Sequence, residues 1–358
     1  MKGIVSSVCI IGNFGCETGQ LDGQTMKSRS MRALMELKGV HDYASFDTEI
    51  LHFNWLSAFT MFRLLWNTER LFFMGGQRNL TYLFPLFWVI AKLRGIECHY
   101  FVVGGWIAEY LRNRPIHRWI LRRINGIYCE TCSICKKLED WYGYTNADWF
   151  PNFRISDFRP DITFYEGFPL RLIFMARIIA QKGYPVVFDL AERIQAQLGD
   201  KKVIIDFYGP LYDEDQERFL RGVEKYPFLH YRGVLQPEVI NETLSRYDAM
   251  LFPTTYAGEG VPGTIVDAYI SGIPVIASDW RYNAELVEHE KTGFIVDLRL
   301  HDQLFCAVER LLKDRSLLLA MKKQARSKSY EFQHEHAWKV IEDKVGLIVH
   351  LPTNKNYI

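Results

Sequence analysis

The 358-residue chain has no excess of charge of either sign, since 43 Lys and Arg residues are balanced by 42 Asp and Glu for a net charge of +1. A chain with this balance has no global attraction for nucleic acid, and we expect no nucleic-acid partner. Cysteine is scarce, with seven residues at irregular spacing. An odd and irregular set does not suit a disulfide framework, so the sequence favours a reducing, cytoplasmic location.

Long hydrophobic runs are also missing. The longest apolar stretch, 80–93, is interrupted by Pro85 and followed by Arg94. A helix needs about 20 apolar residues to cross a bilayer, so we expect no transmembrane helix. The first residues, 1–15, have one Lys and a short apolar run but no clear small-residue cleavage site, and we interpret them as a first strand rather than a signal peptide.

The composition that remains is that of a folded α/β protein. Hydrophobic residues make up 48% of the chain, and its length predicts two domains. Short apolar runs alternate with amphipathic stretches, which is typical of parallel sheets covered by helices. We expect strands at 5–11, 71–74, 99–103 and 126–129, and then at 172–175, 203–208, 249–252, 274–277 and 294–296. Helices are expected at 24–37, 184–198, 213–225, 237–245 and 300–313.

This alternation predicts two doubly wound domains, 1–165 and 166–330. Their boundary is expected within 152–169, which contains prolines, glycine and charged residues. The final segment, 331–358, carries an amphipathic helical pattern. Because ligands of open α/β sheets bind beyond the carboxyl ends of the strands, the loops that follow strands are the candidate sites.

One such loop is rich in glycine. It follows the strand at 249–252 and leads into a helix expected at 263–271. Its glycines allow a close approach of the backbone to a ligand, and the N–H groups at the helix start suit a phosphate. Glu259 lies in the loop and Asp267 one turn inside the helix, so one carboxylate could face a sugar and the other a ribose. An ordinary strand–loop–helix connection explains the loop equally well.

A second loop, after the strand at 172–175, carries Arg177 and Lys182. Two cations beside a helix N-terminus can hold a diphosphate without a metal. A solvated basic loop is the alternative. However, Arg-x4-Lys-Gly after one strand and Glu-x7-Asp after another are unlikely to coincide by chance.

These spaced motifs resemble the retaining GT-B glycosyltransferases of family 4. Residues 172–296 carry the resemblance, with Arg177…Lys182-Gly183 for the family's Arg-x4-Lys-Gly and Glu259…Asp267 for its Glu-x7-Glu. The resemblance implies two Rossmann-like domains facing across a cleft, with the last helix crossing back onto the first domain. Asp-Gly-Gln-Thr at 22–25 resembles, more narrowly, enzymes that build capsules and other surface polysaccharides.

The resemblance also assigns roles to residues. It implies a UDP- or GDP-linked sugar as the donor and no metal cofactor. Arg177 and Lys182 would bind the diphosphate, Glu259 the donor sugar and Asp267 the ribose, where the family has a longer Glu. Further donor-binding residues implied are Gly209, Leu235, Val261, Pro262, Gly263 and Thr264.

Two loops of the first half are candidates for the acceptor side. The loop 12–25 holds four glycines but has neither the Gly-Lys-Ser/Thr of a Walker loop nor the spacing of a dinucleotide site. The resemblance places it at the cleft, which makes Gly23, Gln24 and Thr25 acceptor candidates, although Asp22 or Thr25 could simply cap a helix.

The second acceptor-side loop follows the strand at 99–103. Gly104, Gly105 and Trp106 stand where many members of the family have a cleft His. The two glycines would leave room for an acceptor. Trp106 could stack on a sugar face or belong to the core.

A basic run and a cysteine triplet complete the candidates. Residues 111–124 contain five arginines and Trp119 but no acid. They could meet anionic lipid headgroups or a lipid-diphosphate acceptor, or form a solvated helix face. Cys129, Cys132 and Cys135 lack the fourth cysteine of an iron–sulfur site, and we interpret them as thiols without a metal.

The favoured interpretation is thus a retaining glycosyltransferase of surface polysaccharide synthesis. Its partners would be the donor, a glycan or lipid-linked oligosaccharide acceptor and, if the arginines bind lipid, the inner face of an anionic membrane. Two alternatives stay open. One is a non-catalytic, nucleotide-sugar-binding partner subunit, and the other is a GT-B sugar-nucleotide epimerase.

Overall fold

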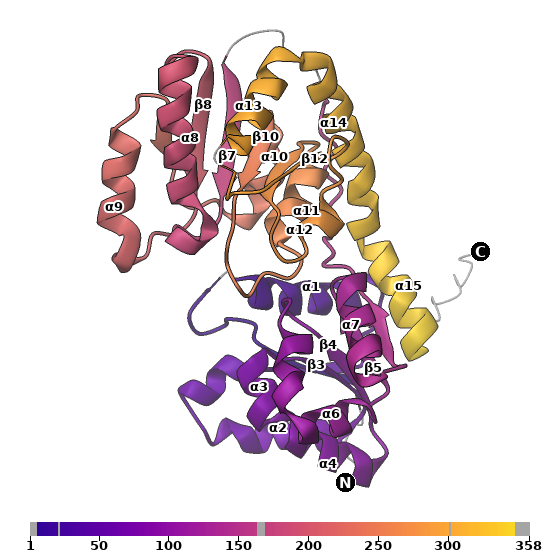
Figure 1. Ribbon diagram of the computed structural model, residues 1–358. Helices are drawn as coiled ribbons and strands as arrows, with labels where there is room; N and C mark the ends of the chain where they lie inside the picture. Colours follow the sequence, from indigo (N-terminus) through magenta and orange to yellow (C-terminus); the bar gives the residue numbers. More distant parts are fainter. Residues whose placement is uncertain (1–5, 21, 163–168, 301, 348–358) are drawn as a thin grey trace, which may run out of the picture. The chain divides into compact units, whose positions relative to one another are not determined.

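The computed structural model describes residues 6–20, 22–162, 169–300 and 302–347. The chain divides into two compact units, unit 1 with Met1–Ile155 and Phe332–Ile358, and unit 2 with Ser156–Glu331. The first break therefore lies at 155, inside the expected boundary region 152–169 and ten residues before the predicted domain end at 165. Each unit is built on one six-stranded sheet (Figure 1).

The sheet of unit 1 has the order β2-β1-β3-β4-β5-β6, and all of its strands run parallel. Its strands are β1 (Ser6–Gly12), β2 (Tyr43–Asp47), β3 (Thr68–Met74), β4 (Glu97–Phe101), β5 (Gly126–Cys129) and β6 (Ala147–Trp149). The four strands expected here are confirmed. The edge strands β2 and β6 are short and only partly buried, so they lack the apolar run that marks a central strand.

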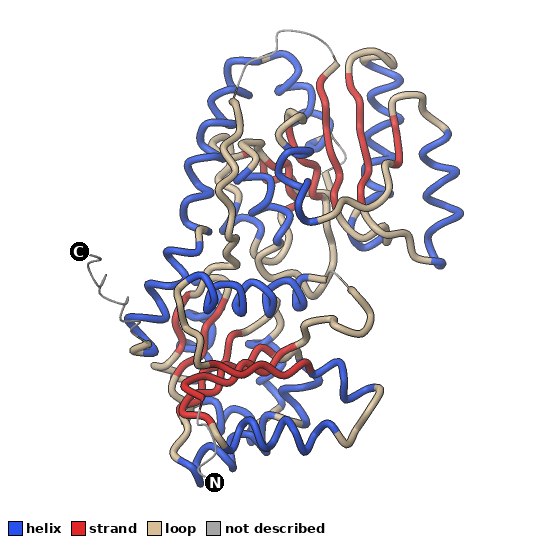
Figure 2. Tube along the Cα trace, turned by 180° about the vertical axis from the view of Figure 1, so that it is seen from behind, coloured by secondary structure: helices blue, strands red, loops and turns tan. Residues whose placement is uncertain are grey.

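Helices cover both faces of this sheet (Figure 2). On one face, Met31 of α1 and Ile341 of α15 share a buried cluster with Phe72 of β3. Side chains of a strand alternate between faces, so the neighbouring Phe73 points the other way and its ring lies 5.8 Å from that of Phe87 on α4. The helical segments of unit 1 are α1 (Gly23–Leu37), η1 (Thr48–His52), α2 (Ser57–Trp66), α3 (Gln77–Tyr82), α4 (Phe84–Arg94), α5 (Ile107–Tyr110), η2 (Leu111–Asn113), α6 (Pro115–Leu121), α7 (Cys132–Tyr142) and α15 (His334–Val345).

Unit 2 has the parallel sheet order β12-β11-β10-β7-β8-β9. Its strands are β7 (Leu170–Met175), β8 (Val203–Tyr208), β9 (Leu229–Tyr231), β10 (Ala249–Phe252), β11 (Val275–Ser278) and β12 (Gly293–Val296). The five expected strands are confirmed, and the three-residue edge strand β9 was not anticipated. Two doubly wound sheets are therefore present, as the alternating pattern predicted.

The helical segments of unit 2 follow the expected order. They are η3 (Ala180–Lys182), α8 (Tyr184–Gln197), α9 (Asp213–Glu224), η4 (Pro237–Val239), α10 (Ile240–Leu244), α11 (Gly263–Ile270), α12 (Asn283–Leu286), α13 (Gln303–Lys313), α14 (Arg315–Lys328) and η5 (Ser329–Phe332). The helix expected at 237–245 is a 3-10 turn followed by one short α-helix. None of the helices in the described ranges is long and apolar enough to span a membrane.

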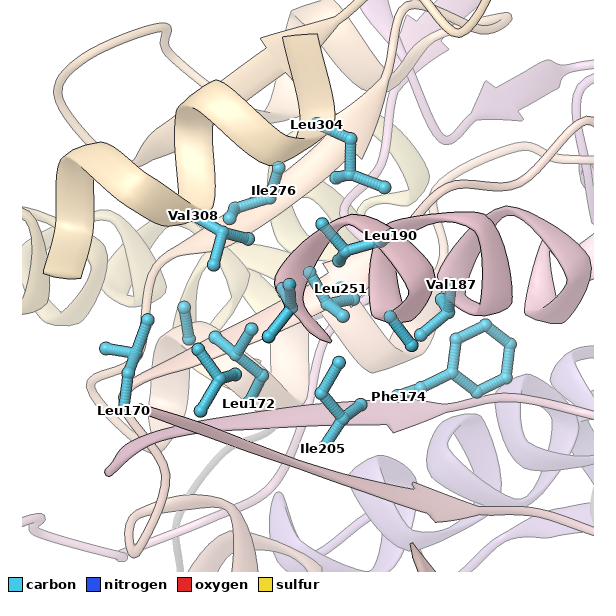
Figure 3. Close-up of a cluster of buried hydrophobic side chains, with 14 of the residues drawn as sticks. Leu170, Leu172, Phe174, Val187, Leu190, Ile205, Leu251, Ile276, Leu304 and Val308 are labelled. Atoms are coloured by element: carbon cyan, nitrogen blue, oxygen red, sulfur yellow. The ribbon is translucent and has the colours of Figure 1, made fainter. Parts of the chain in front are cut away.

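Aliphatic side chains of the sheet and of two covering helices form the core of unit 2 (Figure 3). Leu172 of β7 and Ile205 of β8 pack in the same fully buried cluster as Leu190 of α8 and Val308 of α13. Burying one such side chain contributes about 1.5–3 kcal/mol. This packing gives the loops at the carboxyl ends of the strands a rigid base.

Each sheet has one point where the strand order reverses. In unit 1 the chain winds outward from β1 to β2 and then, in the other direction, from β3 to β6. In unit 2 the corresponding neighbours are β7 and β10. Such a switch point leaves a gap between two loops that leave in opposite directions, and ligands of open α/β sheets bind there.

Candidate functional site

The two loops singled out by the motifs meet at the switch point of unit 2. β10 pairs with β7, with Ala249 opposite Leu172, so the loops that follow the two strands leave the sheet side by side. They are tied together by hydrogen bonds to one carbonyl. Thr255 N–H donates to Gln181 O over 2.8 Å, and Thr254 Oγ1 donates to the same oxygen over 3.3 Å.

Glycine is required where these loops touch the backbone. Gly183 has φ +96°, and a Cβ added there would lie 2.1 Å from the carbonyl oxygen of Pro253. Gly209 has φ +145°, and its Cβ would lie 1.7 Å from Ala176 O. Side chains are excluded at both positions by conformation and by space. Gly209, assigned to nucleotide binding by resemblance, thus supports the loop that carries Arg177.

Lys182 and Glu259 form an ion pair across the two loops. The Nζ of Lys182 contacts Oε1 of Glu259, and the two side chains are 11% and 7% exposed. Thr254 Oγ1 donates to the same carboxylate oxygen over 3.0 Å. In a buried pair of this kind, each charge compensates the other. A ligand that binds Lys182 must therefore also provide a hydrogen-bond donor for Glu259.

The ring of Tyr256 contacts both cations. The guanidinium carbon of Arg177 is 5.1 Å from the ring centroid and the Nζ of Lys182 is 4.7 Å from it, within the range of cation–π contacts. Burial alone would lower the pKa of Arg177, but the Tyr256 hydroxyl and the charge of Glu259 raise it overall, so Arg177 stays charged. Trp280 Nε1 donates to Tyr256 O over 2.8 Å and fixes the turn.

Helix α11 begins directly after this loop. Pro262 precedes the first helical residue, Gly263, and no side chain caps the helix start. The Oγ1 atom of Thr264 is buried and has no hydrogen-bond partner within the described ranges. Val261 is buried at 4% exposure. A helix start without a side-chain cap, with a buried hydroxyl in its first turn, suits an anion.

Asp267 and Leu235 occupy different surroundings. Asp267 is 8% exposed on α11, and its main-chain oxygen accepts from Asn241 Nδ2 of α10 over 3.2 Å. Leu235 is half-buried in the loop after β9, which lies two strands from β7. The structure therefore brings Arg177, Lys182 and Glu259 together directly.

Sequence reasoning did not select Thr254, Tyr256 or Trp280. Thr254 and Tyr256 belong to the loop that carries Glu259. Their place in this loop was the only sequence feature that could have pointed to them. Their roles depend on the pairing of β7 with β10, which joins segments more than 70 residues apart in the chain. No local motif encodes such a contact.

At the switch point of unit 1, buried carboxylates hold the glycine-rich loop. Asp47 accepts from the backbone N–H groups of Phe14 over 3.0 Å and Cys16 over 2.9 Å. Burial acts to raise the pKa of Asp47, but the backbone donors lower it overall. Thr18 Oγ1 donates to Glu49 over 2.5 Å, and Arg29 Nε donates to Phe14 O over 2.7 Å.

The three acceptor candidates of this loop differ in exposure. Asp22 caps α1 by accepting from Thr25 N–H over 2.8 Å, one of the alternatives left open by the sequence. Thr25 is fully buried, and its hydroxyl accepts from Gln20. Gly23 is exposed, while Gln24 lies so close to Gly76 that a Cβ there would be 2.9 Å from its Oε1. Gln24 thus lies between the loops after β1 and β3.

The Gly104-Gly105-Trp106 segment is anchored by its own backbone. Trp106 is half-buried, and its Nε1 donates to Val103 O over 2.7 Å. Lys27 Nζ donates to the neighbouring Val102 O over 2.6 Å. The indole N–H of Trp106 is therefore used inside the unit, and its ring lies 5.3 Å from that of Tyr110.

The cysteine triplet is split between the core and the surface. Cys129 is buried, Cys132 is exposed and Cys135 is intermediate. Burial and a contact with Cys135 raise the pKa of the Cys129 thiol well above its ordinary value. In the part of the chain that the structure describes, no group of three or more His, Cys, Asp or Glu side chains is placed to hold a metal ion.

A comparison with known families identifies the region that carries this geometry. Residues 169–314 match the family model described as "Glycosyl transferases group 1". This region is a group 1 glycosyltransferase domain. Arg177, Lys182, Tyr256 and Glu259 all lie inside it, as do β7 and β10.

Curated relatives of the group 1 domain resemble it over part of their length. The amylovoran biosynthesis glycosyltransferase AmsK of Erwinia amylovora is 25% identical over 180 residues, which cover 49% of this chain and 44% of that protein. A GDP-mannose-dependent α-(1-6)-phosphatidylinositol monomannoside mannosyltransferase of Mycobacterium tuberculosis is 27% identical over 155 residues, 42% of this chain and 40% of that protein. Each match spans less than half of the relative.

Solved structures share the fold over nearly the whole chain. HepE of Anabaena, crystallised with UDP and glucose, superposes with a TM-score of 0.70 at 13% identity. The match covers 96% of this chain and 100% of HepE. With its two doubly wound sheets, the chain has the GT-B fold that the sequence predicted.

Proposed function

We propose that the chain is a retaining glycosyltransferase that moves a sugar from a nucleotide diphosphate sugar to a hydroxyl of a glycan or lipid-linked saccharide in surface polysaccharide synthesis. One observation carries the proposal. Arg177, Lys182 and Glu259 converge at the switch point of the group 1 glycosyltransferase domain, beside the start of α11. Two cations at such a point suit a diphosphate.

The named relatives support the substrate classes. The printed name of AmsK refers to amylovoran biosynthesis, and that of the mycobacterial relative to GDP-mannose and a phosphatidylinositol mannoside. HepE was crystallised with UDP and glucose. These proteins favour a UDP- or GDP-linked donor and a saccharide acceptor for this chain as well.

The proposed reaction breaks the bond between the anomeric carbon and the diphosphate oxygen. The acceptor oxygen bonds to the same carbon, and the acceptor proton passes to the departing diphosphate. Arg177 and Lys182 neutralise the charge that develops on this leaving group. When Lys182 turns to the phosphate, Glu259 is free to accept hydrogen bonds from the donor sugar. Before the donor binds, the ion pair between Lys182 and Glu259 holds both side chains in place.

We further propose that this chemistry is independent of metal, because the two cations take the role that Mg²⁺ has in other transferases. Turnover is expected to persist in EDTA. Complete loss of turnover in EDTA that added Mg²⁺ or Mn²⁺ restores would contradict this part of the proposal.

Asp267→Ala is expected to weaken nucleotide binding itself, since ribose hydroxyls are held equally in the ground and transition states.

The central test is an assay of the full chain with UDP- and GDP-linked sugars, with and without saccharide acceptors. Glu259→Gln is expected to lower transfer by at least about 100-fold while nucleoside diphosphate binding and the fold survive. Glu238→Gln, an exposed carboxylate of the same unit, is the control and should be silent. Donor binding without any turnover would instead indicate a partner subunit, and an epimerised donor without acceptor would indicate an epimerase.

A further inference from the structure

Helix α4 of unit 1 carries apolar side chains on two opposite sides. Phe84, Phe87 and Ala91 are buried against the sheet. Leu86, Val89 and Leu93 repeat the same spacing on the outer side and are 52%, 48% and 74% exposed. A helix that is apolar all round is normally buried, so the outer side of α4 lacks the cover that its composition calls for.

The exposed apolar side chains continue onto the neighbouring helices α2 and α6. We call Phe59, Trp66, Leu86, Val89, Leu93 and Trp119 the outer apolar surface. Arg94 of α4 lies 4.9 Å from the ring of Trp66 on α2, and Trp88 of α4 lies 5.0 Å from Trp119 of α6. Figures 1 and 2 show the three helices together on the face of the unit 1 sheet away from α1. The surface is therefore continuous across three elements.

The helices that form this surface carry charge of one sign, and the exposed carboxylates of Glu69 and Glu97 lie just beyond the ends of α2 and α4. The segments α2, α3, α4, η2 and α6 contain Arg and Lys but no Asp or Glu. Lys92 is exposed on α4, and Arg123, just after α6, stacks on Trp119 at 4.3 Å. The basic run noted in the sequence is thus one edge of a larger apolar and basic surface.

We propose that the outer apolar surface docks unit 1 on an anionic lipid bilayer. Exposed Trp and Phe beside aliphatic side chains suit the boundary between headgroups and acyl chains, and cations at the margin suit anionic headgroups. Helix α4 has 11 residues and is about 16 Å long, far short of the ~30 Å hydrocarbon core, so it lies on the bilayer rather than across it. This docking does not depend on the proposed glycosyl transfer.

The test is co-sedimentation of the full chain with vesicles of neutral lipid or of neutral lipid with anionic phosphatidylglycerol. We expect binding to the anionic vesicles at about 0.05 M salt and its loss at about 0.5 M, where charges are screened. Lys92→Gln/Arg123→Gln should lower vesicle affinity by about 25-fold, or about fivefold for each cation. Phe59→Ser/Leu93→Ser should lower it by about tenfold or more.

Matched variants in unit 2 are the controls. Leu300→Ser removes a leucine that is 54% exposed, and Arg221→Gln removes an exposed arginine. Both should bind vesicles as the unaltered chain does, and all variants should keep its melting temperature and its turnover of soluble donor. Absence of vesicle binding at low salt, or equal losses in the unit 2 controls, would overturn the proposal. A dimer broken by Phe59→Ser/Leu93→Ser, without vesicle binding, would assign the surface to a second copy and also overturn it.

Discussion

Unit 1 and unit 2 both wind a parallel sheet outward from a central strand pair, β1 and β3 in one and β7 and β10 in the other. The loops at the unit 2 pair present Arg177 and Lys182 to a single small space around Tyr256. In unit 1, by contrast, Arg29 is bonded to the loop backbone and Lys27 to Glu130. Lys182 is paired with Glu259 much as Lys27 is with Glu130, so the two units differ chiefly in the arginine: Arg29 is bonded to the loop backbone, whereas Arg177 contacts the ring of Tyr256.

The outer surfaces of the two units differ as well. Exposed large apolar residues of unit 2 are scattered, at Tyr212, Val234, Val239, Leu300 and Tyr330. In unit 1, seven such residues lie on α2, α4 and α6 among basic side chains, and others, such as Trp55 and Trp141, lie elsewhere. Unit 1 therefore carries a larger exposed apolar and basic surface than unit 2.

The largest expected effect on stability lies in the buried ion pair of unit 1. Lys27 and Glu130 are 2% and 4% exposed and 3.0 Å apart. Lys27→Met removes the ion-pair partner of the buried Glu130 carboxylate and should lower the free energy of unfolding by about 3–5 kcal/mol, measured by denaturant titration. Lys27→Met/Glu130→Leu should recover much of this loss. If the free energy of unfolding of Lys27→Met falls by less than about 1 kcal/mol, the ion pair between α1 and the end of β5 does not stabilise unit 1 as proposed.

A pair of glycine substitutions compares the two switch points directly. Gly183→Ala forces a side chain into the Pro253 carbonyl at positive φ and should cost about 2–3 kcal/mol of stability, with weaker nucleotide binding. Gly23→Ala meets open space among the described residues and should change stability by less than about 0.5 kcal/mol. Thermal unfolding with and without UDP or GDP measures both. Equal effects would contradict the close contact of the two unit 2 loops.

A smaller effect should appear as a pH dependence of unit 1. Burial lowers the pKa of His99 on β4 to about 4, below its ordinary value of 6.5. Between these values the unfolded chain binds the proton and the folded chain does not, so stability is full above pH 6.5 and falls as pH drops towards 4. The loss at pH 5 should be at most about 2 kcal/mol. In His99→Gln this part of the pH dependence should vanish, and an unchanged profile would contradict the assignment.

The comparison also shows what the sequence could and could not predict. Residues 172–175 of β7 and 249–252 of β10 are continuous apolar runs, and the motif carrying Arg177 and Lys182 is local, so both were found. The edge strands β6 and β9 have three residues each, and β2, β6 and β9 are all partly exposed, so their pairing depends on the rest of the sheet. Tyr256 was missed because only the pairing of β7 with β10 brings its ring close to both cations.

The outer apolar surface could not be predicted for a related reason. Leu86, Val89 and Leu93 have the composition of a core helix, and sequence alone does not say which side of α4 faces the sheet. Packing against Phe73, Phe62 and Tyr100 distinguishes the buried side from the exposed one. Apolar spacing alone therefore does not show which side of a helix is exposed.

Calorimetric titration of UDP and GDP into the full chain tests most directly whether the cations of unit 2 hold a diphosphate. The unaltered chain should bind at least one of them. Arg177→Ala and Lys182→Ala should each lower that affinity by about 10- to 100-fold, as expected for a lost charge-assisted hydrogen bond. Each variant should also turn over the donor more slowly, because it loses about 2–4 kcal/mol of transition-state stabilisation. Lys201→Ala, an exposed lysine of the same unit, should bind normally. Unchanged affinity in both site variants, or no binding of either nucleotide to the unaltered chain, would contradict the assignment.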